Sequence, residues 1–583
     1  HGIGRRQRQM CIRDSREAVG RDDSDAAAPT DGSTYTYAHE YTYTLDDGST
    51  LTAGPFSILR VDDDHPFPED QGLNFVQIAE IAEISIALLA NLIVKLTNLF
   101  NVGSVASEAP EGATDQPRMS REDLRILGGL LADLIKKKDS LAAASSDAHE
   151  QRRGGADRSS RASWSLLSTI IDAFAFLLEE ALELILRFAG LYGTAVDIEE
   201  FEELFQTIVA PDVLSVWQSD HEFAKLRVAG PNPNSIRRVV GALPANFAVT
   251  EADYQSVMGT DDSIAAAIDE ARLYYTDYAA LAAQTAGDTG SLQKYATAPL
   301  ALFALPKGGG SLQPVAIQLH QTPGTRNPVF TPHSGEAWAM AKVHAQVADS
   351  NYHELISHLG LTHLLIEPFA VSTHRKLPAN HPLYILLLPH FQGTLFINNA
   401  AFVALINPGG VIDRLLTGTI TADWQVASDA LSSLSFDDWM LPNELAARGV
   451  ADGPLPFPYR DDALLLWGAI RQWARDYLAI YYADDAAVAA DASVQAWAAD
   501  LVAEDGGRIQ GFGQPVEGGV GITTFDYLVD VATMVVFTAS VQHAAVNFPQ
   551  RGIMSYTPAM PLAAYAPAPT RTSGINPGEG MLE

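Results

Sequence analysis

The stretch NYHELISHLGLTHLL, residues 351–365, repeats a histidine every five residues, at His353, His358 and His363. The residues around them are mostly apolar and include no proline, which predicts a buried helix. On an ideal α-helix five residues advance about 500°, which leaves neighbouring histidines about 140° apart and poorly placed for one metal ion. A π-bulge adds a residue to the turn and brings positions five apart onto one face. The spacing therefore favours a metal site on a locally π-helical segment.

A second helix is predicted over FTASVQHAAVNFPQ, residues 537–550. It carries His543 and Asn547 four residues apart, and this spacing places two side chains on one face of an undistorted helix. Three imidazoles and one amide oxygen, with no thiolate, suit iron better than a structural zinc ion. A buried histidine is more often a hydrogen-bonded core residue, so the spacing alone leaves both interpretations open. His353 fits either a metal ligand or a residue beside the ligands.

The composition bounds the classes of function. The chain has 583 residues, of which 47% are hydrophobic, and its formal net charge of −33 argues against a nucleic-acid partner. Its only cysteine lies in HGIGRRQRQMCIRDSR, residues 1–16, which has no apolar segment and no periodic pattern. We interpret these residues as a non-native, adapter-like tail. Without that tail the chain has no cysteine for disulfides, zinc ribbons or thiol catalysis.

The N-terminal part, residues 17–200, combines several patterns. STYTYAHEYTYTLDDGSTLTA, residues 33–53, alternates Tyr and Thr before Asp-Asp-Gly and predicts a β-hairpin. The apolar segments 81–100 and 165–192 contain charged residues and predict core helices. An alternative is that they cover a lipid entrance and touch a membrane surface. Residues 103–163 are predicted to be a mobile connection that carries one helix.

From about residue 200 onward the pattern is mostly helical. We expect residues 201–583 to form the core that holds the metal. The predicted fold class is therefore mainly α, with small hairpin or sheet regions. The metal site would lie between two long core helices, at least one of them with a π-bulge.

These motifs resemble the lipoxygenase family, and specifically its bacterial members without the N-terminal β-barrel (PLAT) domain. The segment SVQHAAVNFPQ carries the H-x3-N motif of that family. DHEFAKLRVAGPNPNSIRRV, residues 220–239, resembles the segment on the substrate side, with its Ala-Gly-x-Asn-Pro core. The signature H-x4-H-x4-H-x17-H-x8-H is met without a gap by His353, His358, His363, His381 and His390.

The resemblance implies one non-haem iron ion per chain. The protein ligands it implies are His358, His363, His543 and Asn547. The family closes the site with the carboxylate of a C-terminal Ile. This sequence ends in GINPGEGMLE, so we expect the natural chain to continue further, and Glu583 is not expected to be a ligand.

Residues around the ligands take their roles from the same resemblance. His353 is expected beside the site, and His381 and His390 in structural hydrogen bonds. Glu354 occupies a position where the family often has Gln, and Gln550 matches an amide near Asn547. A contact between Glu354 and Gln550 could orient Asn547, and an ionised carboxylate there would alter the electronic properties of the iron.

Ala401 and Leu405, which follow His390 in the sequence, are expected to position the substrate and oxygen. Ala401 matches the position at which the family places Ala in S-specific enzymes and Gly in R-specific ones. Leu405 matches a bulky residue that presses the substrate over the iron. The product implied is an S-hydroperoxide.

The function implied is dioxygenation of a polyunsaturated fatty acid of the linoleate or arachidonate class by a monomer. A membrane lipid surface is a further partner, and a periplasmic or secreted location is expected. One alternative is a catalytically inactive relative that binds lipid or membrane. A second is a zinc hydrolase, which requires a placed Glu base that HELISH, with its second His one residue too far for H-E-x-x-H, does not provide.

Overall fold

The computed structural model describes residues 35–71 and 198–574, apart from residues 46, 63, 64, 66, 203, 207 and 291. Within this part of the chain, residues 35–71 pack with the residues from 212 onward as one compact unit, and residues 198–211 belong to a second. The domain boundary near residue 200 stays a prediction. The predictions for residues 1–16, 81–100, 103–163 and 165–192 lie outside the described residues.

Helices dominate the described residues, which confirms the mainly α fold class. The α-helices are α5 (Glu199–Glu202), α6 (Asp220–Ala229), α7 (Glu251–Met258), α8 (Ile264–Asp269), α9 (Glu336–Tyr352), α10 (Leu365–Lys376), α11 (Pro382–Leu387), α12 (Thr394–Ala404), α13 (Val411–Leu415), α14 (Ile420–Ser433), α15 (Phe436–Trp439), α16 (Leu441–Ala447), α17 (Pro458–Leu478), α18 (Asp485–Ala489), α19 (Ala492–Val502), α20 (Phe525–Phe537), α21 (His543–Asn547) and α22 (Pro549–Ile553). The 3₁₀ turns are η2 (Glu69–Gln71), η4 (Asp212–Ser215), η5 (Ala279–Leu281), η6 (Pro332–Ser334), η8 (Leu388–His390) and η10 (Thr557–Ala559).

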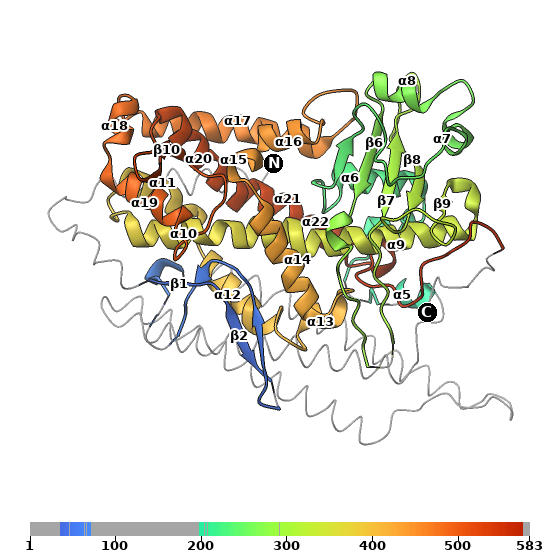
Figure 1. The fold of residues 1–583 in the computed structure, drawn as a ribbon, viewed down its shortest axis with the longest axis horizontal. Coiled ribbons are helices and arrows are strands. Elements are labelled where there is room, and N and C mark those ends of the chain that lie inside the picture. The colour runs from blue at the N-terminus through green and yellow to red at the C-terminus, as the bar shows by residue number, and fades with distance from the viewer. Residues whose placement is uncertain are drawn as a thin grey trace. The chain divides into compact units, whose positions relative to one another are not determined.

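One long helix runs through the middle of the fold and contains the histidine repeat (Figure 1). It consists of α9, the π-helix η7 (His353–Leu364) and α10 without a break. Inside η7 the Thr362 hydroxyl donates to the Ser357 carbonyl oxygen, five residues earlier, at 2.8 Å. The predicted π-helical distortion is therefore confirmed, and it covers twelve residues rather than a single bulge.

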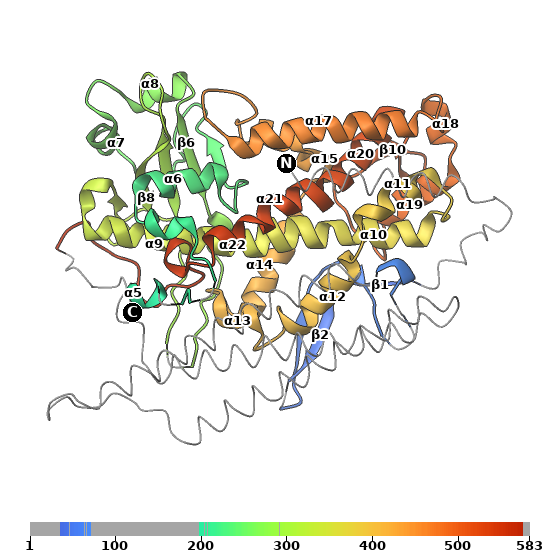
Figure 2. The same cartoon turned by 180° about the vertical axis from the view of Figure 1, so that it is seen from behind.

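The second predicted helix is also interrupted by a π segment. The helix α20 passes through η9 (Thr538–Gln542) into α21, so that His543 follows the distortion directly. Figure 2 shows this helix crossing the long one, and α21 packs against η7. Because both helices are distorted next to their histidines, both can aim those side chains at the space between them.

The hairpin predicted over residues 33–53 is confirmed. The strands β2 (Tyr41–Thr44) and β3 (Thr50–Ala53) pair antiparallel around the Asp-Asp-Gly turn. Two further short strands, β1 (Tyr37–Ala38) and β4 (Ile58–Leu59), pair beside it. The hairpin Tyr rings stack on α12 and α14, because Tyr41 lies 5.2 Å from Phe402 and Tyr43 lies 5.3 Å from Trp424 between ring centroids.

A five-stranded antiparallel sheet occupies a region that the sequence pattern assigned mostly to helices. Its strands follow the order β5 (Ile236–Arg238), β6 (Leu273–Asp277), β7 (Leu300–Ala304), β8 (Gln313–Gln318) and β9 (Val329–Phe330). The central strand LALFA is buried on both faces, so it lacks the alternation that reveals a strand. A last hairpin pairs β10 (Gln514–Val516) with β11 (Gly519–Gly521).

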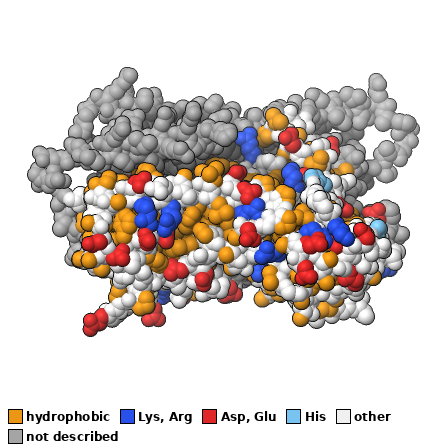
Figure 3. Space-filling view, turned by 90° about the horizontal axis from the view of Figure 1, so that it is seen from above, with side chains coloured by type: hydrophobic (Ala, Val, Ile, Leu, Met, Phe, Trp, Pro, Cys, Tyr) orange, Lys and Arg blue, Asp and Glu red, His pale blue; other side chains and the backbone are white. Residues whose placement is uncertain are grey.

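Among the described residues, two stretches of helix are apolar and long enough to cross a membrane by length and composition alone, residues 336–376 and 525–553. In the most apolar window of each, 83% and 61% of the residues are buried inside the protein, as expected of core helices. Hydrophobic side chains also reach the surface. Figure 3 shows them gathered over the region where α17 runs, and the exposed residues there include Leu465, Leu466 and Ile480.

The close approach of α14 to η7 depends on a glycine. A Cβ atom at Gly360 would lie 3.2 Å from the Leu355 carbonyl oxygen and 3.5 Å from that of Ala427 on α14. We expect Gly360→Leu to separate the helices and cost about 1–3 kcal/mol of unfolding free energy. On α17, Gly468 has open space around its Cβ position. Gly468→Leu should be neutral or stabilising by up to about 1 kcal/mol. Urea unfolding of both variants tests this, and equal losses would contradict it.

Candidate metal centre

Three imidazole nitrogens from the two π-distorted helices converge on one point. His363 Nε2 lies 3.3 Å from His358 Nε2 and 3.2 Å from His543 Nε2. One nitrogen from each of the three rings falls within 4.8 Å of the others, and all three residues are partly buried. Nitrogen lone pairs brought this close favour a shared proton or a cation between them.

His353, the first histidine of the repeat, does not join this group of three. Its side chain is fully buried, and its Nε2 lies 2.7 Å from the Val546 carbonyl oxygen on α21. The imidazole therefore ties η7 to the second helix. This position agrees with a residue beside the site rather than with a ligand.

The far side of the His358 ring is held by a carboxylate and an amide. His358 Nδ1 lies 3.2 Å from Glu354 Oε2, and Gln550 Nε2 donates to Glu354 Oε1 at 3.0 Å. A proton on Nδ1 satisfies the Glu354 contact and leaves Nε2 free to bind a cation. The expected contact between Glu354 and Gln550 is present. Burial would raise the pKa of Glu354, but His353 and His358 beside it hold that pKa below its usual value.

The far side of the His363 ring is held by Asn398, which the sequence analysis missed. His363 Nδ1 lies 2.8 Å from Asn398 Oδ1, and Asn398 Nδ2 donates to Glu367 Oε2 at 2.8 Å. Glu367 accepts a further bond from the Leu59 backbone N–H at 2.8 Å. Burial raises the pKa of Glu367 to about 7, although both N–H groups oppose this. The available signal was a polar Asn inside the apolar run TLFINNAAFVA.

Asn398, on α12, also bonds the backbone of η7. Its Nδ2 also lies 3.1 Å from the His363 carbonyl oxygen. Pro368, five residues after His363, has no N–H to offer the preceding turn. The Asn398 amide therefore bonds both the ring and the backbone of His363, which fixes this residue where the π-helix passes into α10.

Burial lowers the pKa of two of the converging imidazoles, His363 and His543. Burial, followed by the neighbouring His358 and His543, lowers the pKa of His363 well below its usual value. Burial and His358 lower the pKa of His543 to about 4. At neutral pH these rings therefore keep the lone pairs that a metal ion requires.

The remaining predicted site residues lie on α21, which carries His543, or at α12, which contacts η7. Asn547 is the last residue of α21, one helical turn after His543, and is partly buried. Ala401 lies on α12 and Leu405 caps its C-terminal end one turn later, where the Leu405 N–H donates to the Ala401 carbonyl oxygen at 2.8 Å. Leu405 packs against the hydrophobic cluster that contains Leu364, the residue after His363.

The last two signature histidines lie apart from the converging nitrogens. His381 Nδ1 accepts a bond from the Leu383 N–H and caps α11, and its Nε2 lies 3.1 Å from Asp491 Oδ2. Burial lowers the pKa of His390 to about 4, and its Nε2 has no hydrogen-bond partner among the described residues. Neither belongs to the group of three.

The donor set fits a transition-metal ion such as iron. Three imidazole nitrogens face one another, the rings of His358 and His363 have their other nitrogen bonded, and Asn547 lies one turn after His543. The geometry does not fit a zinc hydrolase, because Glu354 bonds the rear nitrogen of His358 and is not placed as a base beside a metal-bound water.

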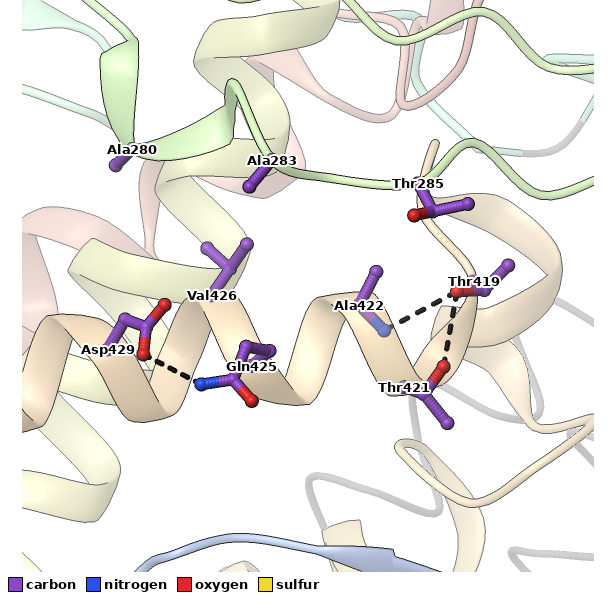
Figure 4. A pocket seen from close by; sticks show the side chains of 9 residues that line it. All are labelled: Ala280, Ala283, Thr285, Thr419, Thr421, Ala422, Gln425, Val426 and Asp429. Carbon is purple, nitrogen blue, oxygen red and sulfur yellow. Dashed lines mark hydrogen bonds between the residues drawn. The ribbon is translucent and has the colours of Figure 1, made fainter.

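A hollow elsewhere on the unit is not part of this centre. It has a volume of about 340 Å³ and lies along α14, and none of the three histidines lines it. Figure 4 shows Gln425 bonded to Asp429, at 2.7 Å, and Thr419 to Thr421, at 3.3 Å, within its lining.

Comparison with known proteins agrees with this geometry. Residues 198–575 match the family model described as Lipoxygenase. The chain is 45% identical over 395 residues to the linoleate 9/13-lipoxygenase of Pseudomonas aeruginosa, covering 66% of this chain and 56% of that protein. It is 34% identical to the polyunsaturated fatty acid lipoxygenase ALOX15B of Homo sapiens, covering 67% and 57%. The chain thus spans little more than half the length of the curated relatives it matches.

Solved structures show the same fold. The structure of a calcium-dependent 11R-lipoxygenase is similar with a TM-score of 0.61 and 35% identity, over 66% of this chain and 57% of that one. That of a coral 8R-lipoxygenase gives a TM-score of 0.61 and 34% identity, over 67% and 58%.

We expect Asn398→Ala to weaken metal binding about 10- to 100-fold, because it frees both the ring and the backbone of His363. The measurement is the dissociation constant for Fe²⁺ under anaerobic conditions. The matched control is Asn399→Ala, which removes the same side chain at the next position of α12. Unchanged affinity in Asn398→Ala, or an equal loss in the control, would show that Asn398 does not support the ligand.

Proposed function

The chain belongs to the lipoxygenase family, and we propose that it is a non-haem iron dioxygenase that adds O2 to a polyunsaturated fatty acid. The observation that carries this proposal is the convergence of three imidazoles. His363 Nε2 lies within 3.3 Å of both His358 Nε2 and His543 Nε2. The substrates named for the relatives, linoleate and polyunsaturated fatty acids, support the substrate class. The S-hydroperoxide product, a monomeric state, export and contact with a membrane surface stay predictions.

The chain's own residues would hold and aim the ion. His358, His363 and His543 supply nitrogen donors, and Asn547 supplies an amide oxygen from the same helix as His543. Iron in this environment supplies the one-electron oxidation that takes a hydrogen atom from a doubly allylic CH2 group. The hydrogen bonds to Glu354 and Asn398 keep each ring in the tautomer that presents Nε2 to the ion.

Substrate handling falls to α12 and the apolar side chains around it. Asn398 fixes this helix to His363, so Ala401 on the helix and Leu405 at its end keep a constant position relative to the centre. In the overall reaction the substrate loses a hydrogen atom, gains O2 and recovers the hydrogen on the peroxide, so no further reductant is consumed. No side chain acts as acid or base, and the protein contributes by orienting the acyl chain and excluding water.

Removing a central imidazole should abolish the reaction. We expect His363→Ala to lower the rate of conjugated-diene formation from linoleate by more than about 100-fold, because one of the three nitrogen donors is lost. The control is His374→Ala on α10, whose ring bonds Asp70 and the Ala370 carbonyl oxygen instead. Persistent diene formation in a folded His363→Ala protein would reject the proposed function. A wild type that binds linoleate without turnover would favour the inactive lipid-binding alternative.

Ala401 should control the chirality of the product. With a methyl group at this position we expect mainly the S-hydroperoxide, and Ala401→Gly should raise the R fraction by opening space beside α12. Chiral chromatography of the product from linoleate measures both. Leu405→Val, one turn further along, should alter the turnover rate more than the chirality. A wild-type product that is mainly R would show that the residue does not act in this way.

A further inference from the structure

The connection between α6 and β5 reaches both ligand-bearing helices. Its sequence GPNPNS, residues 230–235, is the core of the segment expected on the substrate side, yet every residue in it is buried. Two of these residues, Asn232 and Asn234, direct their amide groups into the protein. Buried amides require partners, and the identity of those partners shows what the connection does.

Asn232 bonds the first helix immediately before a ligand. Its Oδ1 accepts a hydrogen bond from the Ser357 hydroxyl at 2.8 Å, and Ser357 directly precedes His358. Its Nδ2 donates to Asp349 Oδ1 at 2.8 Å, two turns of helix earlier. The amide thus offers a donor to the carboxylate and an acceptor to the hydroxyl at the same time.

Asn234 bonds the second helix at the corresponding place. Its Oδ1 accepts a hydrogen bond from Gln542 Nε2 at 2.9 Å, and Gln542 directly precedes His543. Gln542 Oε1 in turn accepts a bond from the Tyr459 hydroxyl at 2.5 Å. Gln542 is the last residue of the π segment η9, so this contact fixes the distorted turn from which His543 projects.

The connection, residues 230–235, is also held by contacts that do not involve the candidate metal ligands. Arg448 Nη1 donates to the carbonyl oxygens of Pro233 at 3.1 Å and Ile236 at 2.7 Å. Asp349, the other partner of Asn232, forms a buried ion pair with Arg227 at 3.0 Å. Because two buried arginines fix the segment and its partner, the two asparagines form a rigid bridge rather than a flexible link.

We propose that Asn232 and Asn234 are positioning residues that set the separation between His358 and His543. A metal site tolerates only about 0.2 Å of error in ligand distances, whereas two packed helices can slide by more than that. Hydrogen bonds from one segment to the residue preceding each ligand remove this freedom. The inference rests on the proposed function only for the identity of the ion.

The test is the binding of Co²⁺ and of Fe²⁺ to the full chain and to Asn232→Ala and Asn234→Ala. We expect each variant to weaken binding about 10-fold and to shift the visible ligand-field bands of bound Co²⁺, because the donors no longer hold one geometry. The matched control is Asn327→Ala. It removes a buried amide, as little exposed as that of Asn234, which bonds the carbonyl oxygens of His320 and Thr322 between β8 and β9.

The midpoint temperature of thermal unfolding of each metal-free protein separates positioning from general stability. The proposal requires Asn327→Ala to keep wild-type affinity and spectrum even where its midpoint falls as far as that of Asn234→Ala. Wild-type spectra in both bridge variants, or an equal loss of affinity in the control, would overturn the bridge alone. A wild-type chain that binds neither ion would overturn the proposed function together with this inference.

Discussion

The fold depends on one distortion of the helix backbone, the change from α to π geometry at the histidines. An α-helix with this sequence would turn His358 and His363 about 140° apart and could not direct both rings at one ion. The π-helix η7 brings their Nε2 atoms to 3.3 Å. Since η9 distorts the second helix directly before His543, the same solution is used on both sides of the centre. A π turn is rarely favourable by itself, so neighbouring elements have to hold it.

Those neighbours act through side chains that bond the helices next to the ligands. Asn398 comes from α12, Gln550 from α22, and Asn232 from the connection after α6. His353 joins them from within the repeat by bonding the Val546 carbonyl oxygen of the opposite helix. Each contact joins residues that lie far apart in the sequence and side by side in the fold. The centre is therefore a property of the packed unit rather than of either helix alone, and the cost of the distortion is spread over many hydrogen bonds.

The five-residue histidine repeat indicated the π distortion, because few helix geometries place such positions on one face. The two helices and the mainly α class followed from the apolar, helical pattern of the sequence around the histidines and from about residue 200 onward. The β2–β3 hairpin was predicted from its alternating Tyr and Thr residues. The sheet was not, since the strand LALFA is buried on both faces and has no period to detect. The roles of Asn398 and Glu367 could not be predicted from the sequence for a different reason. Their roles depend on where α12 and the Leu59 strand pack, 35 and 308 residues away from their partners.

The arrangement of charge follows from the choice of donors. Imidazoles and an amide add no negative charge, so none of the four donors named above offsets the charge of a divalent ion. The nearest carboxylates that the hydrogen bonds reveal are Glu354, one contact behind His358, and Glu367, two contacts behind His363. Each acts through a polar group rather than by ligation, so it compensates the ion without occupying a coordination position. Positive charge at the centre would favour the ionised form of both carboxyls, which in turn strengthens the bonds that orient the two rings. The ion and the surrounding hydrogen bonds therefore stabilise each other.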